Sequence, residues 1–294
     1  MKKKNKALKN TMSFLVFAGP AVLVFFAVIL VAFFNGIQLT FTDWNGLSDS
    51  YQYIGLTNYA NALSDTAFWD SLGRTFKYVV CVVAFTNIIA FLIAFFLTRG
   101  YKGQGIFRVA FFTPNLIGGV VLGIVWKFVF SQVFTQIGSK YGMALFKNNW
   151  LSTPDSAFIA LVVVAVWQLA GYLMLIYMAG IISLPKEVQE AARLDGAVGW
   201  KNIRHIVIPL IMPSVTIAVF MSIKTAFMAY DVNLALTNGG PFQSTELVAM
   251  RVYNEAFQAE NYGVGQTEAL ILFAIVAVIS IIQVILTKSK EVEA

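Results

Sequence analysis

The chain has 294 residues, of which 58% are hydrophobic and only 12% are charged, and its mean hydropathy is +0.72. A soluble domain normally has about 25% charged residues, because water must solvate its surface. This composition excludes an ordinary soluble protein and predicts that lipid surrounds much of the chain. The single Cys81 and the single His205 exclude a disulfide framework and a Cys/His zinc site within the chain.

Apolar segments long enough to cross a bilayer core of about 30 Å recur along the sequence. The first follows a Lys-rich start at residues 1–13, as in a secretory signal, but it exceeds the roughly 7–15 apolar residues of a cleaved one. We therefore expect an uncleaved span. The sequence predicts an all-α membrane protein with one domain over 14–287, a tail at 288–294, and about six spans, at 14–34, 78–97, 109–126, 157–184, 206–223 and 269–286.

The distribution of Lys and Arg predicts the orientation of these spans. With a cytoplasmic N-terminus, most of the 21 basic residues fall on the cytoplasmic side, in the segments 1–13, 98–108, 185–205 and 287–294. The loop 127–156 departs from this trend, since it has three Lys and one Asp. The net charge of +6 is thus a topology signal and does not indicate nucleic-acid binding. We expect both termini to be cytoplasmic.

The predicted external segments 35–77 and 224–268 are rich in aromatic residues. Two interpretations stay open, an interfacial aromatic belt and a docking surface for an external partner. The residues concerned are Trp44, Tyr51, Tyr53, Tyr59, Trp69, Tyr253 and Tyr262.

The loop at 185–209 has the features of a helix–turn–helix elbow. Pro185 suits the start of a helix, because its missing N–H is not needed there. Gly196 can adopt the left-handed conformation that ends a helix, and a second short helix is expected from about Gly199 to Pro209. Its small side chains would let such an elbow fit into a groove, although these physical features alone also suit an idle amphipathic loop.

The spacing within this loop is more specific. Glu190-Ala191-Ala192, Gly196, Ile206 and Ile208-Pro209 resemble the EAA loop of binding-protein-dependent ABC importer permeases, with Ile208 where the family usually has Leu. The resemblance implies a MetI-like permease fold in which the elbow docks in a cytoplasmic ATPase subunit. It assigns ATPase coupling to Glu190, Ala191, Ala192, Asp195 and Gly196, and Asp195-Gly196-Ala197 is similar to the carbohydrate branch.

Other segments extend the resemblance to sugar permeases over nearly the whole chain. They are similar to the larger-partner permease of maltose-, raffinose- or glycerol-phosphate-type systems, and they comprise Phe41–Trp44, Gly55–Tyr59, Trp167–Gly180, Leu236–Pro241 and Ser244–Glu246. The resemblance implies a bacterial inner-membrane heterodimer with a second homologous permease, two ABC ATPases and an extracellular solute-binding protein. The sequence has no G-x-x-x-x-G-K-[ST] phosphate loop, so we expect no cofactor in this chain, with ATP and Mg²⁺ bound by the ATPases.

Polar and aromatic residues within apolar spans are candidates for a sugar path, because sugars bind to aromatic faces and hydrogen-bonding groups. These candidates are Trp167, Gln168, Tyr172, Ser222, Thr225, Tyr230, Asp231 and Asn233. In maltose-type relatives, Trp167, Tyr172 and Ser222 match sugar-contact positions, while two asparagines of the relatives fall at Ala226 and Ala229. For each candidate, hydrogen bonding between helices is an alternative.

Three further features have structural interpretations. We expect Gly119-x-x-x-Gly123 to permit close helix packing, Asn87 to join helices, and Lys224 to extend toward an interface.

Two other classes of function stay open at this stage, a self-sufficient channel or carrier and a membrane enzyme. No catalytic motif supports the enzyme. A non-sugar solute such as glycerol phosphate is the alternative cargo.

Overall fold

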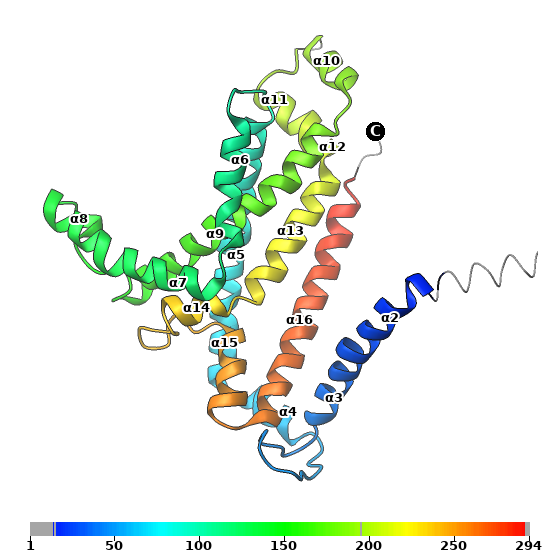
Figure 1. Ribbon diagram of the computed structural model, residues 1–294, viewed down its shortest axis with the longest axis vertical. Helices are drawn as coiled ribbons and strands as arrows, with labels where there is room; N and C mark the ends of the chain where they lie inside the picture. Colours follow the sequence, from blue (N-terminus) through cyan, green and yellow to red (C-terminus); the bar gives the residue numbers. More distant parts are fainter. Residues whose placement is uncertain (1–13, 15, 195, 292–294) are drawn as a thin grey trace, which may run out of the picture. The chain divides into compact units, whose positions relative to one another are not determined.

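The structure is a computed structural model that describes residues 14, 16–194 and 196–291. Apart from one isolated bridge between Thr42 and Tyr53, the described residues are helical or irregular and form no strand. The helices, with π- and 3-10 segments marked η, are α2 Gly19–Phe25, η1 Phe26–Leu30, α3 Val31–Leu39, α4 Thr57–Ser64, α5 Thr66–Leu97, α6 Gln104–Phe112, η2 Thr113–Leu116, α7 Gly119–Phe128, η3 Val129–Val133, α8 Phe134–Tyr141, η4 Ala144–Phe146, α9 Pro154–Ile182, α10 Lys186–Leu194, α11 Trp200–Asn202, η5 Ile203–Val207, α12 Ile208–Leu210, α13 Met212–Phe227, α14 Asp231–Leu236, α15 Val248–Tyr253, η6 Asn254–Gln258 and α16 Tyr262–Lys288 (Figure 1).

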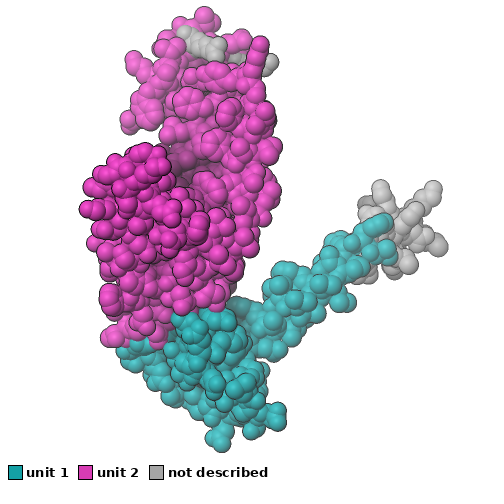
Figure 2. Space-filling view, turned by 60° about the vertical axis from the view of Figure 1, so that its left-hand side comes forward, with its two compact units in different colours: residues 1–65, 252–270 teal, residues 66–251, 271–294 magenta. Residues whose placement is uncertain are grey.

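The chain forms two compact units, residues 1–65 with 252–270 and residues 66–251 with 271–294, coloured separately in Figure 2. Five helices are long and apolar enough to cross a membrane, and a bent pair would make a sixth span. This agrees with the all-α membrane fold and with about six spans.

In the first unit, the segments Phe41–Trp44 and Gly55–Tyr59 pack against each other. Asn58 is buried and donates from its amide to the carbonyl oxygens of Thr40 and Thr42, at 3.0 and 2.7 Å. The Tyr59 ring lies 5.5 Å from that of Phe41, and the Trp44 ring lies 4.9 Å from that of Tyr262. The aromatic residues of these segments therefore include side chains that hold the unit together, an interpretation that the sequence did not suggest.

The core of the second unit is made by α5, α9 and α13, which contact one another along their lengths (Figure 1). Small residues allow the helices to approach closely: Ala90, Ala94 and Ala160 are fully buried. Gly171 of α9 lies against the backbone of Phe111, where a side-chain carbon would overlap the carbonyl group. Helices in lipid associate by such close packing, because no hydrophobic force drives them together there.

The predicted third span at 109–126 is wrong as a single helix. The chain breaks between α6 and α7, with Ile117 extended and Pro114 in a 3-10 turn. The apolar helix of this region runs instead over 119–141. Hydropathy averages over a window and does not detect a break in which Pro and Gly interrupt an otherwise apolar sequence.

The predicted fifth span at 206–223 corresponds to a bent element. Residues 200–210 and 212–227 are helical, and the two parts meet at an angle of 78°. Pro213, at the second position of α13, suits the start of a new helix there. The second predicted span begins earlier than expected, at Thr66, and the last helix covers Tyr262–Lys288.

Candidate functional site

The elbow predicted at 185–209 is present at one end of the second unit, as α10 followed by a turn and α11 (Figure 1). Gly196 has φ +73°, and the Ala197 N–H donates to the Ala192 carbonyl oxygen at 2.8 Å. This bond joins the residue after the left-handed glycine to the last turn of the helix, as in a Schellman cap. The local geometry therefore agrees with the expected helix end, and Asp195 lies outside the described residues.

Several described residues of the elbow are exposed. Ala192 is buried, whereas Glu190 and Ala191 are exposed. Leu194 and Trp200 are 90% and 67% exposed. These two large apolar side chains lie at the apex of the elbow, where they are available for contact with another protein.

A groove of about 710 Å³ lies beside the elbow, between it and the ends of α5 and α9. Arg99 and Tyr101, from the predicted cytoplasmic loop 98–108, line this groove together with Val198 and Asn202 of the elbow. The two basic loops thus share one end of the unit, as their predicted placement on the same side of the membrane requires.

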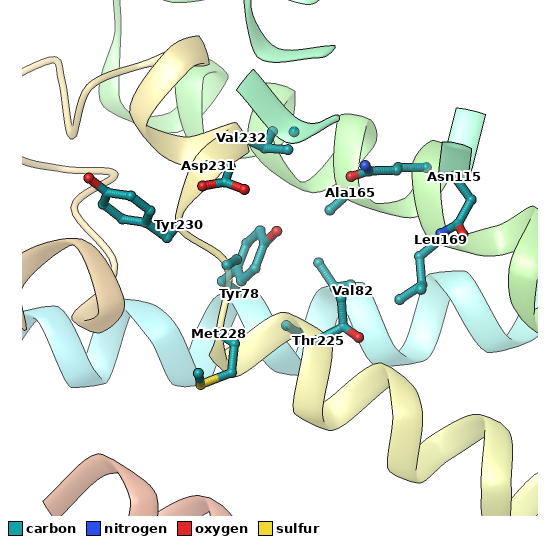
Figure 3. Close-up of a pocket in the computed structure, with 14 residues that line it drawn as sticks. Tyr78, Val82, Asn115, Ala165, Leu169, Thr225, Met228, Tyr230, Asp231 and Val232 are labelled. Carbon is teal, nitrogen blue, oxygen red and sulfur yellow. The ribbon is translucent and has the colours of Figure 1, made fainter. Parts of the chain in front are cut away.

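A polar cavity of about 260 Å³ lies farther along the unit, where α13 ends and α14 begins (Figure 3). Four of the predicted path residues line it, namely Gln168, Thr225, Tyr230 and Asp231. The wall of the cavity therefore contains a carboxylate, an amide, a hydroxyl and a tyrosine, which come from α9, from α13 and from the start of α14.

Tyr78 and Asn115 also line this cavity, and the sequence had not singled them out. Asn115 was a polar residue within a predicted apolar span, which was a usable signal. Ala226 and Ala229 are among the lining residues too. Their small side chains add no polar group to the wall.

The other four predicted path residues do not line this cavity. Trp167 lines a separate apolar cavity of about 620 Å³ beside Cys81, and its ring is 5.3 Å from that of Trp126. Tyr172 packs against the core cluster near the elbow. Asn233, in α14, is fully buried and accepts from the hydroxyl of Thr237 at 2.9 Å.

Ser222 is fully buried and belongs to a hydrogen-bonded group that joins three helices. The Asn87 amide of α5 donates to the Ser222 hydroxyl of α13 at 2.9 Å, and the Tyr177 hydroxyl of α9 donates to the Asn87 side-chain oxygen at 2.7 Å. The expectation that Asn87 joins helices is confirmed.

This group supports a stability prediction. Asn87→Ala removes the acceptor of the Tyr177 hydroxyl and the bond to Ser222, whose hydroxyl still donates to the Val219 carbonyl oxygen. We therefore expect a loss of about 1–2 kcal/mol in the free energy of unfolding. Ser222→Ala should cost less, and the double variant should cost less than the sum of both. Thermal unfolding of the three variants in detergent measures this coupling; strictly additive losses would contradict it.

The glycines of α7 confirm the predicted close packing. A side-chain carbon at Gly123 would lie 2.5 Å from the Ala235 side chain, and one at Gly119 would lie 2.7 Å from that of Asp231. The partner is the short α14, which this contact holds at the cavity wall. Lys224 is exposed in the last turn of α13, and His205 is exposed with its Nδ1 3.1 Å from the Lys201 carbonyl oxygen.

The loop after α14 is anchored to α5. Arg74 donates from Nε to the Glu246 carbonyl oxygen at 3.1 Å and has Nη2 3.8 Å from the Glu246 carboxylate. The Thr245 hydroxyl donates to the Gly240 carbonyl oxygen at 2.8 Å. These contacts order the loop and present Phe242, which is 93% exposed.

No group of three or more His, Cys, Asp or Glu side chains that could hold a metal ion occurs among residues 14, 16–194 and 196–291.

Residues 2–292 match the family model described as binding-protein-dependent transport system inner membrane component. The chain belongs to this family. It is a multi-pass membrane permease subunit of an ABC importer and not an enzyme.

Curated relatives match along nearly the whole permease. It is 40% identical over 293 residues to a probable starch degradation products transport system permease protein of Thermoanaerobacterium thermosulfurigenes, covering 100% of both chains. It is 32% identical to a multiple sugar-binding transport system permease protein of Streptococcus mutans, covering 88% of this chain and 89% of the relative.

Solved structures share the fold. One chain of a bacterial ABC transporter that imports the acidic polysaccharide alginate has a TM-score of 0.82 and 16% identity, with 98% of the permease and 99% of that chain covered. At this identity the similarity concerns the fold of the permease alone.

Proposed function

We propose that this permease forms half of a path through the membrane for a sugar or oligosaccharide that an extracellular solute-binding protein delivers. The observation that supports this most directly is the polar cavity at the junction of α13 and α14. Its lining combines the ring of Tyr78 with the amides of Asn115 and Gln168, which suits the C–H faces and the hydroxyls of a sugar. The names of the relatives, which refer to starch degradation products and multiple sugars, support the same class of solute.

The other half of the path would come from a second, homologous permease in a heterodimer. Two cytoplasmic ABC ATPases would bind ATP and Mg²⁺, since this sequence has no phosphate loop. We infer that the assembly lies in a bacterial cytoplasmic membrane. The exposed apolar apex of the elbow and the family's dependence on a binding protein support these partners.

The coupling role is proposed for Glu190, Ala191, Ala192, Asp195 and Gly196. A nucleotide-driven movement of the ATPases would displace the elbow, and α13 begins directly after the elbow and ends at the cavity. A displacement at one end of this helix is therefore transmitted to the other. Alternating access follows if the packed helices have two arrangements with different affinity for the solute.

The cavity is tested by Thr225→Val, which removes a lining hydroxyl and keeps the shape of the side chain. We expect the KM for uptake to rise about tenfold, corresponding to roughly 1.4 kcal/mol for one lost hydrogen bond. The measurement is ATP-dependent uptake by the complete importer in proteoliposomes, with the permease alone as the blank.

Thr113→Val is the matched control, because Thr113 is exposed, donates to the Val109 carbonyl oxygen and does not line the cavity. An equal KM in the two variants would place the path elsewhere. Uptake by the permease alone would instead favour a self-sufficient carrier.

A further inference from the structure

The charge of the cavity is set by one side chain. Among the described residues that line it, Asp231 alone has a formal charge, and neither Lys nor Arg is present. Figure 3 shows the Asp231 carboxylate and the Tyr78 hydroxyl directed into the same space. Lys224 precedes Thr225 in the sequence but is exposed and is not a lining residue.

The position of this carboxylate is fixed by the fold. Asp231 is the first residue of α14, and α14 packs on α7 so closely that Gly119 has no room for a side chain beside the Asp231 Cβ. The residue is exposed and lines the cavity. The backbone and Cβ of Asp231 are therefore fixed beside α7, and its carboxylate is carried at the cavity wall.

An anionic solute would meet this carboxylate without a compensating cation from the described lining. Between membrane helices the effective dielectric constant is far below that of water, so the repulsion between two like charges a few ångströms apart is strong. A neutral solute avoids this cost, and its hydroxyl groups can donate hydrogen bonds to the carboxylate, which are stronger than those to a neutral acceptor.

We propose that Asp231 is a specificity-determining residue, which makes the cavity accept neutral, hydroxyl-rich oligosaccharides and reject anionic solutes such as uronates or phosphate esters. This inference rests on the proposed function of the cavity as the solute path. It also separates the two cargoes that the sequence leaves open, because glycerol phosphate belongs to the rejected class. The alginate importer has a similar fold, so the lining side chains, and not the fold, must decide the charge of the solute.

The charge of the cavity can be measured without knowing the natural solute. Cys81 is the only cysteine, so Cys81→Ser gives a background in which Thr225→Cys places one thiol in the cavity wall. In the complete importer, this thiol is labelled with a cationic and an anionic methanethiosulfonate. The labelling rate of each reagent is divided by the rate at which the same reagent reacts with a small thiol in solution, which removes the difference in intrinsic reactivity. We expect the cationic reagent to react about tenfold faster or more, since a nearby carboxylate attracts one reagent and repels the other.

Adding Asp231→Asn should bring the two normalised rates to within about twofold of each other. Asp155→Asn is the matched control, because it removes the same charge from an exposed position at the start of α9, outside the cavity; the preference for the cation should remain. Equal rates in the parent, or a preference that survives Asp231→Asn, would overturn the inference, as would a cation that the second permease supplies to the path.

Protection from labelling by a neutral reagent tests the solute class directly. Millimolar maltotriose should slow the labelling of the cysteine at position 225, and trigalacturonate at the same concentration should not. If both sugars protect, the cavity is a sugar path but the inference about charge is wrong. If neither protects while the cation preference is present, the proposed function of the cavity fails, and the inference fails with it.

Discussion

Gly171→Ala should prevent the second unit from folding normally. The added carbon would overlap the carbonyl oxygen of Phe111 and lie 3.0 Å from the Cα of Phe112. Both are backbone atoms, so no side-chain rotation relieves the overlap, and α9 must move away from α6. We expect a loss of at least about 3 kcal/mol, at the upper end of the cost of overpacking. The measurement is the yield of monodisperse protein in detergent and its thermal unfolding.

Gly73→Ala provides the control for this substitution. Gly73 lies in α5, and a side-chain carbon there meets no atom within 4 Å. The same change should be neutral or stabilise the helix by up to about 1 kcal/mol, because Ala has the higher helix propensity. Equal yield and stability of the two variants would contradict the close contact between α9 and Phe111.

Gly196→Pro should weaken the contact between the permease and its ATPases and so reduce transport. The proline ring fixes φ near −65°, whereas Gly196 has φ +73°, so the turn of the elbow must rearrange. We expect ATPase co-purification and uptake to fall at least about tenfold, while the amount of permease in the membrane stays normal. The measurements are subunit ratios after affinity purification and ATP-dependent uptake.

Gly142→Pro is the matched control, since Gly142 has φ +66° and ends α8, far along the chain from the elbow. This variant meets the same backbone conflict but should retain the ATPases. Normal uptake and co-purification in Gly196→Pro would remove the elbow from the coupling mechanism. Loss of the ATPases in both variants would show a general folding defect instead.

The sequence was sufficient for the membrane class, the elbow and its glycine turn, because these depend on composition and on local backbone conformation. It was insufficient for the region around Pro114, where window averages joined α6 and α7 into one span. In the site, the predicted residues Gln168 and Asp231 line one cavity, whereas Trp167 does not. Adjacent residues of a helix point in directions about 100° apart, and α9 is apolar on all sides, so its sequence does not indicate which side faces the cavity.

The bend before α13 gives that helix the geometry of a lever. Its 16 residues correspond to a rod of about 24 Å, at 1.5 Å per residue. If the elbow tilts this rod by about 10°, the far end moves by about 4 Å. Hydrogen bonds are lost well within that displacement, since they need donor–acceptor distances near 3 Å. A modest rotation at the ATPase end would therefore be enough to release a solute held at Thr225, without any helix having to unfold.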